Sequence, residues 1–424
     1  MIFGKIKKMK KFLFILMFLG GVISAQGAQI VRGPYLEDPT PTTMILRWQT
    51  DTPSVSWLEY GPAPRCNQIM TLTTMGTRHK TVLYGLVPNQ DFCYRIYVQN
   101  TAHDGIQEPV SGSFRTLFSA ERKVVSFLAL GSTAKDVPAG VSQEGEDLSF
   151  PSVIEETRQQ ENSFARQEIA DLMAQEKGDF LIHTGNITRS GLNEDANAEF
   201  FTPFKEVLKK TPLFVAVGPN EYGPDRADGE SKSFFRTNYS LYHDMTWSQG
   251  TPKYYFFDTA NARFIFLDTN EAEGAVWAPE IGEKSKQTQW LETTLGSAGD
   301  KWRIVVMNAP AYSTGPKGPN EKVAQAWVKL FEDNRVNLVL QGGDADYERT
   351  FPIRNGEPTA RRGVTYVTLG TSSVAPVKRA AQDPYTQRFV AARHYATGKI
   401  VDRKLTLNVF DNKGKKIDTL ELYN

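Results

Sequence analysis

The stretch His183-Thr184-Gly185-Asn186-Ile187-Thr188-Arg189 decides how this chain is interpreted. It continues an apolar run, Asp179–Ile182, that is typical of a buried strand, and a polar loop at residues 190–197 follows it. A strand that ends in a glycine turn at the edge of an α/β sheet is a common place for a catalytic group. The side chains at this turn are an amide, Asn186, and a guanidinium, Arg189.

Further strands and helices are expected on both sides of this turn. The near-continuous apolar run Val124–Leu130 is typical of a strand covered on both faces. Other predicted strands are Asp179–His183, Leu213–Val217, Phe264–Asp268, Arg303–Met307, Val336–Leu340 and Thr365–Leu369. Predicted helices are Ser163–Lys177 with Ser163 as its cap, Ala198–Lys210, Ser285–Leu295 and Val323–Asn334. Strands that alternate with helices indicate a layered α/β domain.

Two other segments of this region have no helical pattern. The polar stretch Ser132–Asn162 is expected to be a long surface loop. The last part of the chain, Leu405–Phe410 and Ile417–Leu422 around a glycine turn, predicts a hairpin.

The region before the α/β domain predicts an all-β sandwich. Thr43–Gln49 and Ser54–Tyr60 alternate apolar and polar residues, and turn residues separate such runs at regular spacing. The only cysteines, Cys66 and Cys93, lie 27 residues apart in this region. In an exported protein such a pair favours one disulfide, and two buried thiols are the alternative.

The first residues resemble a targeting segment. A lysine-rich start precedes the apolar run Phe12–Val22, and small residues at Ser24–Gly27 allow cleavage. This is the pattern of a secretory signal peptide, and its apolar run is shorter than a spanning helix requires. We therefore expect an exported protein, in the periplasm, at the cell surface or secreted, with no transmembrane segment after signal removal.

Length and charge limit the classes of function. The chain has 424 residues, enough for two domains with a large core. Its formal net charge is only +1, so nothing favours a nucleic-acid partner.

Five short motifs, each directly after a predicted strand, carry a family resemblance. They are Leu130-Gly131-Ser132, Ile182–Ile187, Val217–Glu221, Asn308–Ser313 and Gly342–Arg349. In this order they resemble the binuclear metallophosphatase (calcineurin-like phosphoesterase) superfamily, in particular its purple acid phosphatase-like branch. The resemblance implies a signal peptide at 1–27, a fibronectin type III-like sandwich at 28–118, and a four-layer α/β metallophosphatase-like domain at 122–424.

The residues that this resemblance would make metal ligands are almost all changed. The family binds two cations through Asp, His, Asn and, in the purple branch, Tyr, and the cations activate water and hold phosphoryl oxygens. At the ligand positions this chain has Ser132, Asn186, Arg189, Pro219, Asn308, Gly343 and Ala345, and Asn220 replaces the His that would assist phosphoryl transfer. The chain is therefore predicted to have no catalytic residue, no bound metal and no cofactor.

Three acidic residues remain near the expected pocket: Glu221, Asp344 and Asp346. Arg189 places a fixed positive charge where the cations would lie, and we expect it to pair with one of the three and to hold a metal-free pocket together. A hard cation such as calcium held by the same carboxylates is the alternative. His183 is expected to pack or to orient its loop.

The sequence thus favours an exported pseudophosphatase, a non-catalytic binding or scaffolding protein with a protein partner in an envelope or extracellular assembly. One alternative is an atypical phosphoesterase with an altered metal centre. Another is a metal-free module for a small anionic ligand, in which Arg189 acts with the backbone amides of Gly185 and Gly218.

Overall fold

The computed structural model describes residues 27–100, 108–119, 121–134, 153–189, 196–222, 251, 253–275, 277–360 and 362–424, with the backbone alone at 153–156. The signal peptide predicted at 1–27 lies outside this part of the chain, apart from its last residue. Within the described residues, no helix is long and apolar enough to cross a membrane.

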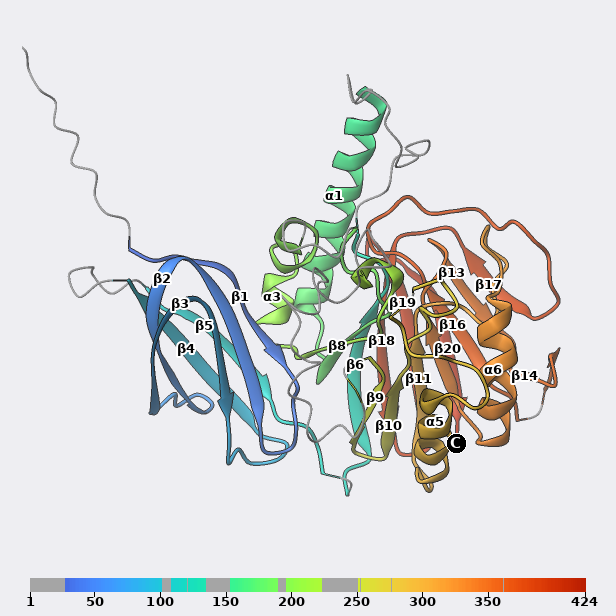
Figure 1. Ribbon diagram of the computed structural model, residues 1–424, viewed down its shortest axis with the longest axis horizontal. Coiled ribbons are helices and arrows are strands. Elements are labelled where there is room, and N and C mark those ends of the chain that lie inside the picture. The colour runs from blue at the N-terminus through green and yellow to red at the C-terminus, as the bar shows by residue number, and fades with distance from the viewer. Residues whose placement is uncertain are drawn as a thin grey trace, which may run out of the picture.

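An all-β domain comes first, at one end of the elongated molecule (Figure 1). Its strands are β1 (Ile30–Glu37), β2 (Met44–Pro62), β3 (Gln68–Leu83), β4 (Asp91–Gln99) and β5 (Val110–Arg115). The first half of β2 pairs with β1 and with the end of β3, whereas its second half pairs with β4 and with the start of β3. Register shifts between Gln49 and Ser56 separate the two halves.

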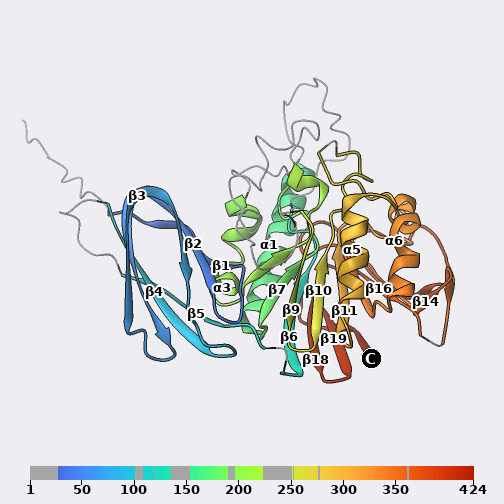
Figure 2. The same cartoon turned by 60° about the horizontal axis from the view of Figure 1, so that its bottom comes forward.

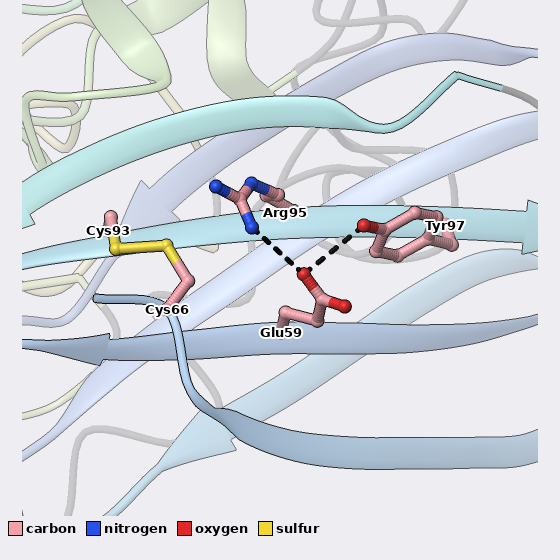
Figure 3. Close-up of a disulfide and its surroundings, with 5 residues drawn as sticks. All are labelled: Glu59, Cys66, Cys93, Arg95 and Tyr97. Atoms are coloured by element: carbon pink, nitrogen blue, oxygen red, sulfur yellow. Dashed lines mark hydrogen bonds and ion pairs between the residues drawn. A yellow bond between two sulfur atoms is a disulfide. The ribbon is translucent and has the colours of Figure 1, made fainter. Parts of the chain in front are cut away.

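Both halves of β2 contribute to one apolar core, as in a sandwich. Trp48 and Leu58, from either side of the register shift, are buried in the same cluster with Tyr94 of β4. Cys66 and Cys93 form a disulfide that joins the segment before β3 to β4, beside an ion pair between Glu59 and Arg95 (Figure 3).

The second domain contains two sheets that pack face to face. The first has the order β20-β19-β18-β6-β7-β8 and the second β17-β13-β16-β12-β11-β10-β9. The strands of the first sheet are β6 (Val124–Leu130), β7 (Phe180–His183), β8 (Leu213–Val215), β18 (His394–Val401), β19 (Lys404–Asp411) and β20 (Lys416–Tyr423). Those of the second are β9 (Tyr255–Thr259), β10 (Ala262–Phe266), β11 (Trp302–Met307), β12 (Leu338–Gln341), β13 (Tyr347–Thr350), β16 (Thr365–Leu369) and β17 (Thr386–Val390). A small ribbon, β14 (Ile353–Arg354) with β15 (Glu357–Pro358), lies apart from both.

Helices cover the outer face of each sheet, which gives four layers (Figure 2). The helical segments of this domain are α1 (Val153–Gln175), the short π-helix η1 (Asn197–Phe201), α3 (Lys205–Leu208), the 3-10 turn η2 (Pro219–Tyr222), α5 (Lys286–Gly296) and α6 (Glu321–Asp333). Ile169 of α1 packs into the core that also fills the space between the sheets, with Phe180 and Phe264. Trp327 of α6 packs into a second core on the far face of the second sheet.

The all-β domain is joined to the first sheet of the α/β domain. β1 pairs with β8 in parallel through Glu37 and Leu213, so one sheet runs through both domains. The Tyr35 ring lies 4.7 Å from that of Phe201. The hydroxyl group of Tyr94 donates a hydrogen bond of 2.7 Å to the carbonyl of Lys209.

Some element predictions were wrong. The expected helix start at Ser163 is contradicted, and so is the last part of the expected loop Ser132–Asn162, because α1 already begins at Val153. Residues 135–152 of that expected loop lie outside the described part of the chain. The first turns of α1 extend beyond the rest of the α/β domain (Figure 1), so they need no apolar face. Their polar sequence was therefore interpreted as a loop. The expected helix Ala198–Lys210 is divided into η1 and α3. Strand β18 was not predicted, although it pairs antiparallel with β6 in the centre of the first sheet.

Candidate functional site: a hydrogen-bonded pocket at the carboxyl ends of the strands

The carboxyl ends of strands from both sheets meet at one edge, and the sequence-predicted pocket residues lie there. β6 leads to Ser132, β7 to Asn186, β11 to Asn308 and β12 to Gly343. The two sheets are linked at this edge because the Asn308 side chain donates a hydrogen bond of 2.7 Å to the carbonyl of Thr184.

The turn after β7 has an unusual backbone. Gly185 and Asn186 both have positive φ angles, 98° and 60°. A Cβ atom at Gly185 would lie 2.7 Å from the carbonyl oxygen of Ala216 and from the amide nitrogen of Gly218, so only glycine fits here. Asn186 tolerates the left-handed region better than most residues do. Backbone N–H groups at such a turn can point toward one anion.

That anion is a carboxylate of the same chain, Glu221. Its oxygens accept hydrogen bonds from the backbone N–H groups of Asn186 (2.8 Å), Ile187 (2.6 Å) and Gly218 (2.8 Å). The side chain is fully buried. Burial raises the pKa of Glu221 to about 7, although the backbone hydrogen bonds act in the opposite direction.

Side chains at positions that the resemblance would assign to metal ligands form hydrogen bonds within the protein. The Oδ1 atom of Asn186 accepts a hydrogen bond of 3.1 Å from the backbone N–H of Asn220. The Ser132 hydroxyl donates one of 3.1 Å to the carbonyl of Asn186. Pro219 begins η2 and carries no donor or acceptor in its side chain. Each of these contacts uses a group that a cation or a substrate would otherwise contact.

His183 is a packing residue, as expected. It is fully buried, its ring lies edge-on to Phe200, and its Nδ1 atom accepts a hydrogen bond of 3.0 Å from the N–H of Gly185. Burial lowers the pKa of His183 to about 3, so the ring is neutral and holds the turn in place.

A separate group of carboxylates lies beyond β12. Asp344 accepts hydrogen bonds from the backbone N–H of Lys317 and from the Ser313 hydroxyl. Asp346 is fully buried, and neither of its carboxyl oxygens has a hydrogen-bond partner among the residues that the structure describes. Burial, followed by the charges of Asp344 and Glu348, raises the pKa of Asp346 to about 8, so this side chain is protonated at neutral pH.

The expectation for Arg189 is contradicted. Its side chain is exposed, and among the described residues it pairs with none of Glu221, Asp344 and Asp346. Its backbone N–H instead donates a hydrogen bond of 2.7 Å to buried Glu199. Burial of a guanidinium together with its counter-charge is costly, and four backbone amides already satisfy the Glu221 carboxylate.

The two amides that were expected to bind an external anion have acceptors within the protein. The Gly185 N–H donates to His183 and the Gly218 N–H donates to Glu221. The expected cation site is also not formed. In the part of the chain that the structure describes, no group of three or more His, Cys, Asp or Glu side chains is placed to hold a metal ion. The residues at this site therefore do not fit the pair of cations that the resemblance implies.

A strap at residues 375–383 crosses the carboxyl edge of the second sheet. The backbone N–H of Val377 donates a hydrogen bond of 2.9 Å to the carbonyl of Ala345, which stands at a former ligand position. The N–H of Ala380 donates one of 2.8 Å to the carbonyl of Thr314, and the Arg379 side chain donates to the Thr314 hydroxyl. The strap thus fastens the loop after β11 to the loop after β12.

Several residues of this region were missed from the sequence. Thr133 joins two loops, because its hydroxyl donates 2.6 Å to the carbonyl of Ile187. The Tyr222 hydroxyl donates 2.6 Å to Asp268, which is fully buried and whose pKa burial raises to about 6. The sequence offered one indication of this pair, namely the positions of its two residues. Tyr222 directly follows Glu221, and Asp268 lies just beyond β10.

Comparisons with known proteins agree with this architecture. The family model for calcineurin-like phosphoesterases matches residues 159–347. The proteins MT2654 and Rv2577 of Mycobacterium tuberculosis, both described as uncharacterized, are 25% identical to this chain over 301 residues. That match covers 66% of this chain and 52% of the curated relatives, so the chain spans about half of their length.

Two solved structures share the fold over 92% of this chain. A purple acid phosphatase, PPD1, from yellow lupin (Lupinus luteus) seeds has a TM-score of 0.69 and 15% identity, with 74% of that chain covered. PhoD has a TM-score of 0.64 and 13% identity, with 91% of that chain covered. Residues 159–347, which lie within the α/β domain, therefore match the calcineurin-like phosphoesterase model, and this match supports the metallophosphatase superfamily that the sequence motifs predicted. The all-β domain in front of it is consistent with the purple acid phosphatase-like arrangement.

Proposed function

We propose that this chain is an exported pseudophosphatase: it keeps the metallophosphatase frame and acts by binding or scaffolding, not by hydrolysis. The observation that carries the proposal is the use of the former ligand positions as internal hydrogen-bonding groups. Asn308 donates to Thr184, and Asn186 accepts from Asn220. A ligand needs lone pairs that point at one shared cation, and these amides are directed at the backbone instead.

The remaining positions support the same proposal by their chemistry. Gly343 and Ala345 have no donor atom in their side chains, and the bound strap covers the carbonyl of Ala345. In the metal-free protein, burial favours the neutral form of Asp346 by raising its pKa to about 8.

Metal analysis together with a hydrolysis assay tests the proposal. We expect purified protein to contain no stoichiometric iron, zinc or manganese and to hydrolyse p-nitrophenyl phosphate at the rate of buffer. The variant Asn186→Asp restores one expected ligand, and we expect it to remain inactive because the His positions are still Gly343 and Ala345. Two transition ions per chain in the wild-type protein would overturn the proposal and favour an atypical phosphoesterase.

The anion-binding alternative has a distinct readout. Inorganic phosphate should raise the melting temperature if the protein binds anions at Arg189, and the increase should vanish in Arg189→Ala. We expect no such increase, since the Gly185 and Gly218 amides already have acceptors. Arg388→Ala on β17 removes another exposed arginine and serves as the control.

Export and partnership belong to the proposal as well. The lysine-rich start and the apolar run that follows it support secretion, and processing of the precursor by signal peptidase is the direct test. A scaffolding protein of the envelope or the extracellular space would bind its partner through surfaces away from the closed pocket.

A further inference from the structure

Among the described residues, no strand pairs with the outer edge of β3, and the first part of this edge lacks the charges and prolines that often protect an edge strand. Among the described strands, β3 is hydrogen-bonded to β2 alone. Behind β2 lies β4 along the first part of β3 and β1 along its last part. An edge strand with free backbone groups can pair with another chain unless charges, prolines or a covering element prevent it.

The first ten residues of β3, Gln68–Thr77, contain no charged residue and no proline. The other outer strands contain at least one charge each: Arg115 in β5, Asp258 in β9, Arg388 in β17, and Lys416, Asp418 and Glu421 in β20. Within β3 itself, Arg78 and Lys80 appear only after this segment. The unprotected edge is therefore confined to one stretch, which we call the β3 edge (Gln68–Thr77).

Apolar side chains are exposed along the β3 edge. Ile69 is 72% exposed and Met75 is 54% exposed. Ile69 lies opposite Glu59 of β2, and Thr71 lies opposite Trp57. The pairing with β2 shifts register between Leu72 and Gly76, so the regular part of the edge is Gln68–Leu72.

The start of this edge is held in place covalently. Cys66 lies two residues before β3, and its disulfide to Cys93 fixes that point to β4 (Figure 3). On the same strands, Glu59 accepts hydrogen bonds from Arg95 and Tyr97. An edge that is already ordered loses little conformational entropy when a strand pairs with it.

We infer that the β3 edge pairs antiparallel with the same edge of a second copy of this chain. In such a two-fold pair, every residue of the edge lies opposite a residue of the same segment. Because Gln68–Thr77 carries no charge, the pairing creates no contact between like charges, which β20 would create with Lys416, Asp418 and Glu421. The inference does not depend on whether the pocket is catalytic, and it would supply a scaffold with a self-assembly surface.

The pairing leaves the α/β domains apart. β1 and β2 lie between β3 and the α/β domain in the order of the sheet, and the all-β domain stands at one end of the molecule (Figure 2). The two α/β domains of such a dimer would therefore remain free to bind other partners.

Sedimentation of the mature chain with charged edge variants tests this inference. We expect the wild-type protein to sediment as a dimer at micromolar concentration, and Thr71→Lys to shift it at least tenfold toward monomer. Thr419→Lys makes the same substitution at an exposed position of β20 and should leave the dimer intact. Circular dichroism of Thr71→Lys checks that the monomer is folded.

Hydrogen exchange provides the second readout. Amides in Gln68–Leu72 should gain protection as the wild-type concentration rises, and those of β20 should not. A wild-type protein that remains monomeric overturns the inference and would leave the edge to a strand of another protein. A dimer that Thr71→Lys and Thr419→Lys weaken equally also overturns it.

Discussion

Glu221 and Ile187 are joined by a hydrogen bond of 2.6 Å from the backbone N–H of Ile187 to the Oε1 atom of the buried carboxylate. The opposite oxygen of Glu221 accepts from Asn186 and Gly218. One carboxylate thus holds the turn after β7 and the turn after β8 together. In this protein the centre of the pocket is organised by an internal anion and backbone amides.

Glu221→Gln should destabilise the fold, although it replaces only one carboxylate oxygen with an amide nitrogen. The amide nitrogen must face at least one backbone N–H, because all the groups around this side chain are donors. We expect a loss of about 1–3 kcal/mol in the free energy of unfolding, measured by urea denaturation. Glu206→Gln changes an exposed glutamate of α3 that pairs with Lys209 and should stay within about 0.5 kcal/mol.

Asn308→Asp should weaken the contact between the two sheets. It replaces the donor to the Thr184 carbonyl with a carboxylate oxygen at about the same place. We expect a loss of about 2 kcal/mol at pH 8, and a smaller loss at pH 5, where a buried Asp can bind a proton. Asn220→Asp, at a partly exposed position, is the control, and an equal loss in both variants would contradict the assigned role of Asn308.

Asp346→Asn should remove a pH dependence of stability. The folded-state pKa of Asp346 is about 8 and its unfolded value is 3.8, so the folded chain retains a proton that the unfolded chain has released. Stability therefore falls as pH rises through this window. The corresponding contributions of Asp268 and Glu221 end near pH 6 and pH 7, because their pKa values are about 6 and about 7.

Between pH 7 and pH 9, the asparagine variant should accordingly lose less stability than the wild-type protein, by about 1 kcal/mol or more. Thermal melts at pH 5, 7 and 9 measure the difference, and Asp300→Asn at an exposed position is the control. Parallel pH profiles for Asp346→Asn and the wild-type protein would show that Asp346 titrates normally.

Tyr35→Ala should destabilise both domains at once. Tyr35 is buried and packs on Phe201, although it belongs to β1 of the all-β domain. Truncation of a large buried ring costs about 3–5 kcal/mol. Hydrogen exchange should show faster opening in β4 and in β11 together, whereas Tyr84→Ala, which removes a ring that is 70% exposed, should change neither. Faster exchange in β4 alone would mean that the domains unfold independently.

The sequence predicted the frame well where one strand carries a strong local pattern. β6 and β16 begin and end at the predicted residues, because both are apolar runs between clear breaks. The prediction from sequence failed where the residue pattern of a segment does not reflect the position of that segment in the tertiary structure. α1 starts at Val153, since a helix that projects into solvent needs no apolar face, and β18 was missed although it completes the sheet beside β6.

The pocket shows the same division. The motifs and their order correctly indicated the metallophosphatase superfamily, whereas their assignment of ligand positions stays a prediction. The prediction that Arg189 would pair with the remaining acids was wrong. It considered charged side chains as partners for these acids and left out the backbone N–H groups. The N–H groups of Asn186, Ile187 and Gly218 bind Glu221 only once the turns after β7 and β8 are adjacent.

By itself, the sequence indicated the superfamily and the two cysteines available for a disulfide, since each depends on residue type and order. Only the tertiary structure decided which partner each polar group has. That choice depends on distances between segments far apart in the chain, such as the 124 residues that separate Thr184 from Asn308. The same physical reason placed Arg189 at the surface, left Asp346 without a partner and exposed the β3 edge.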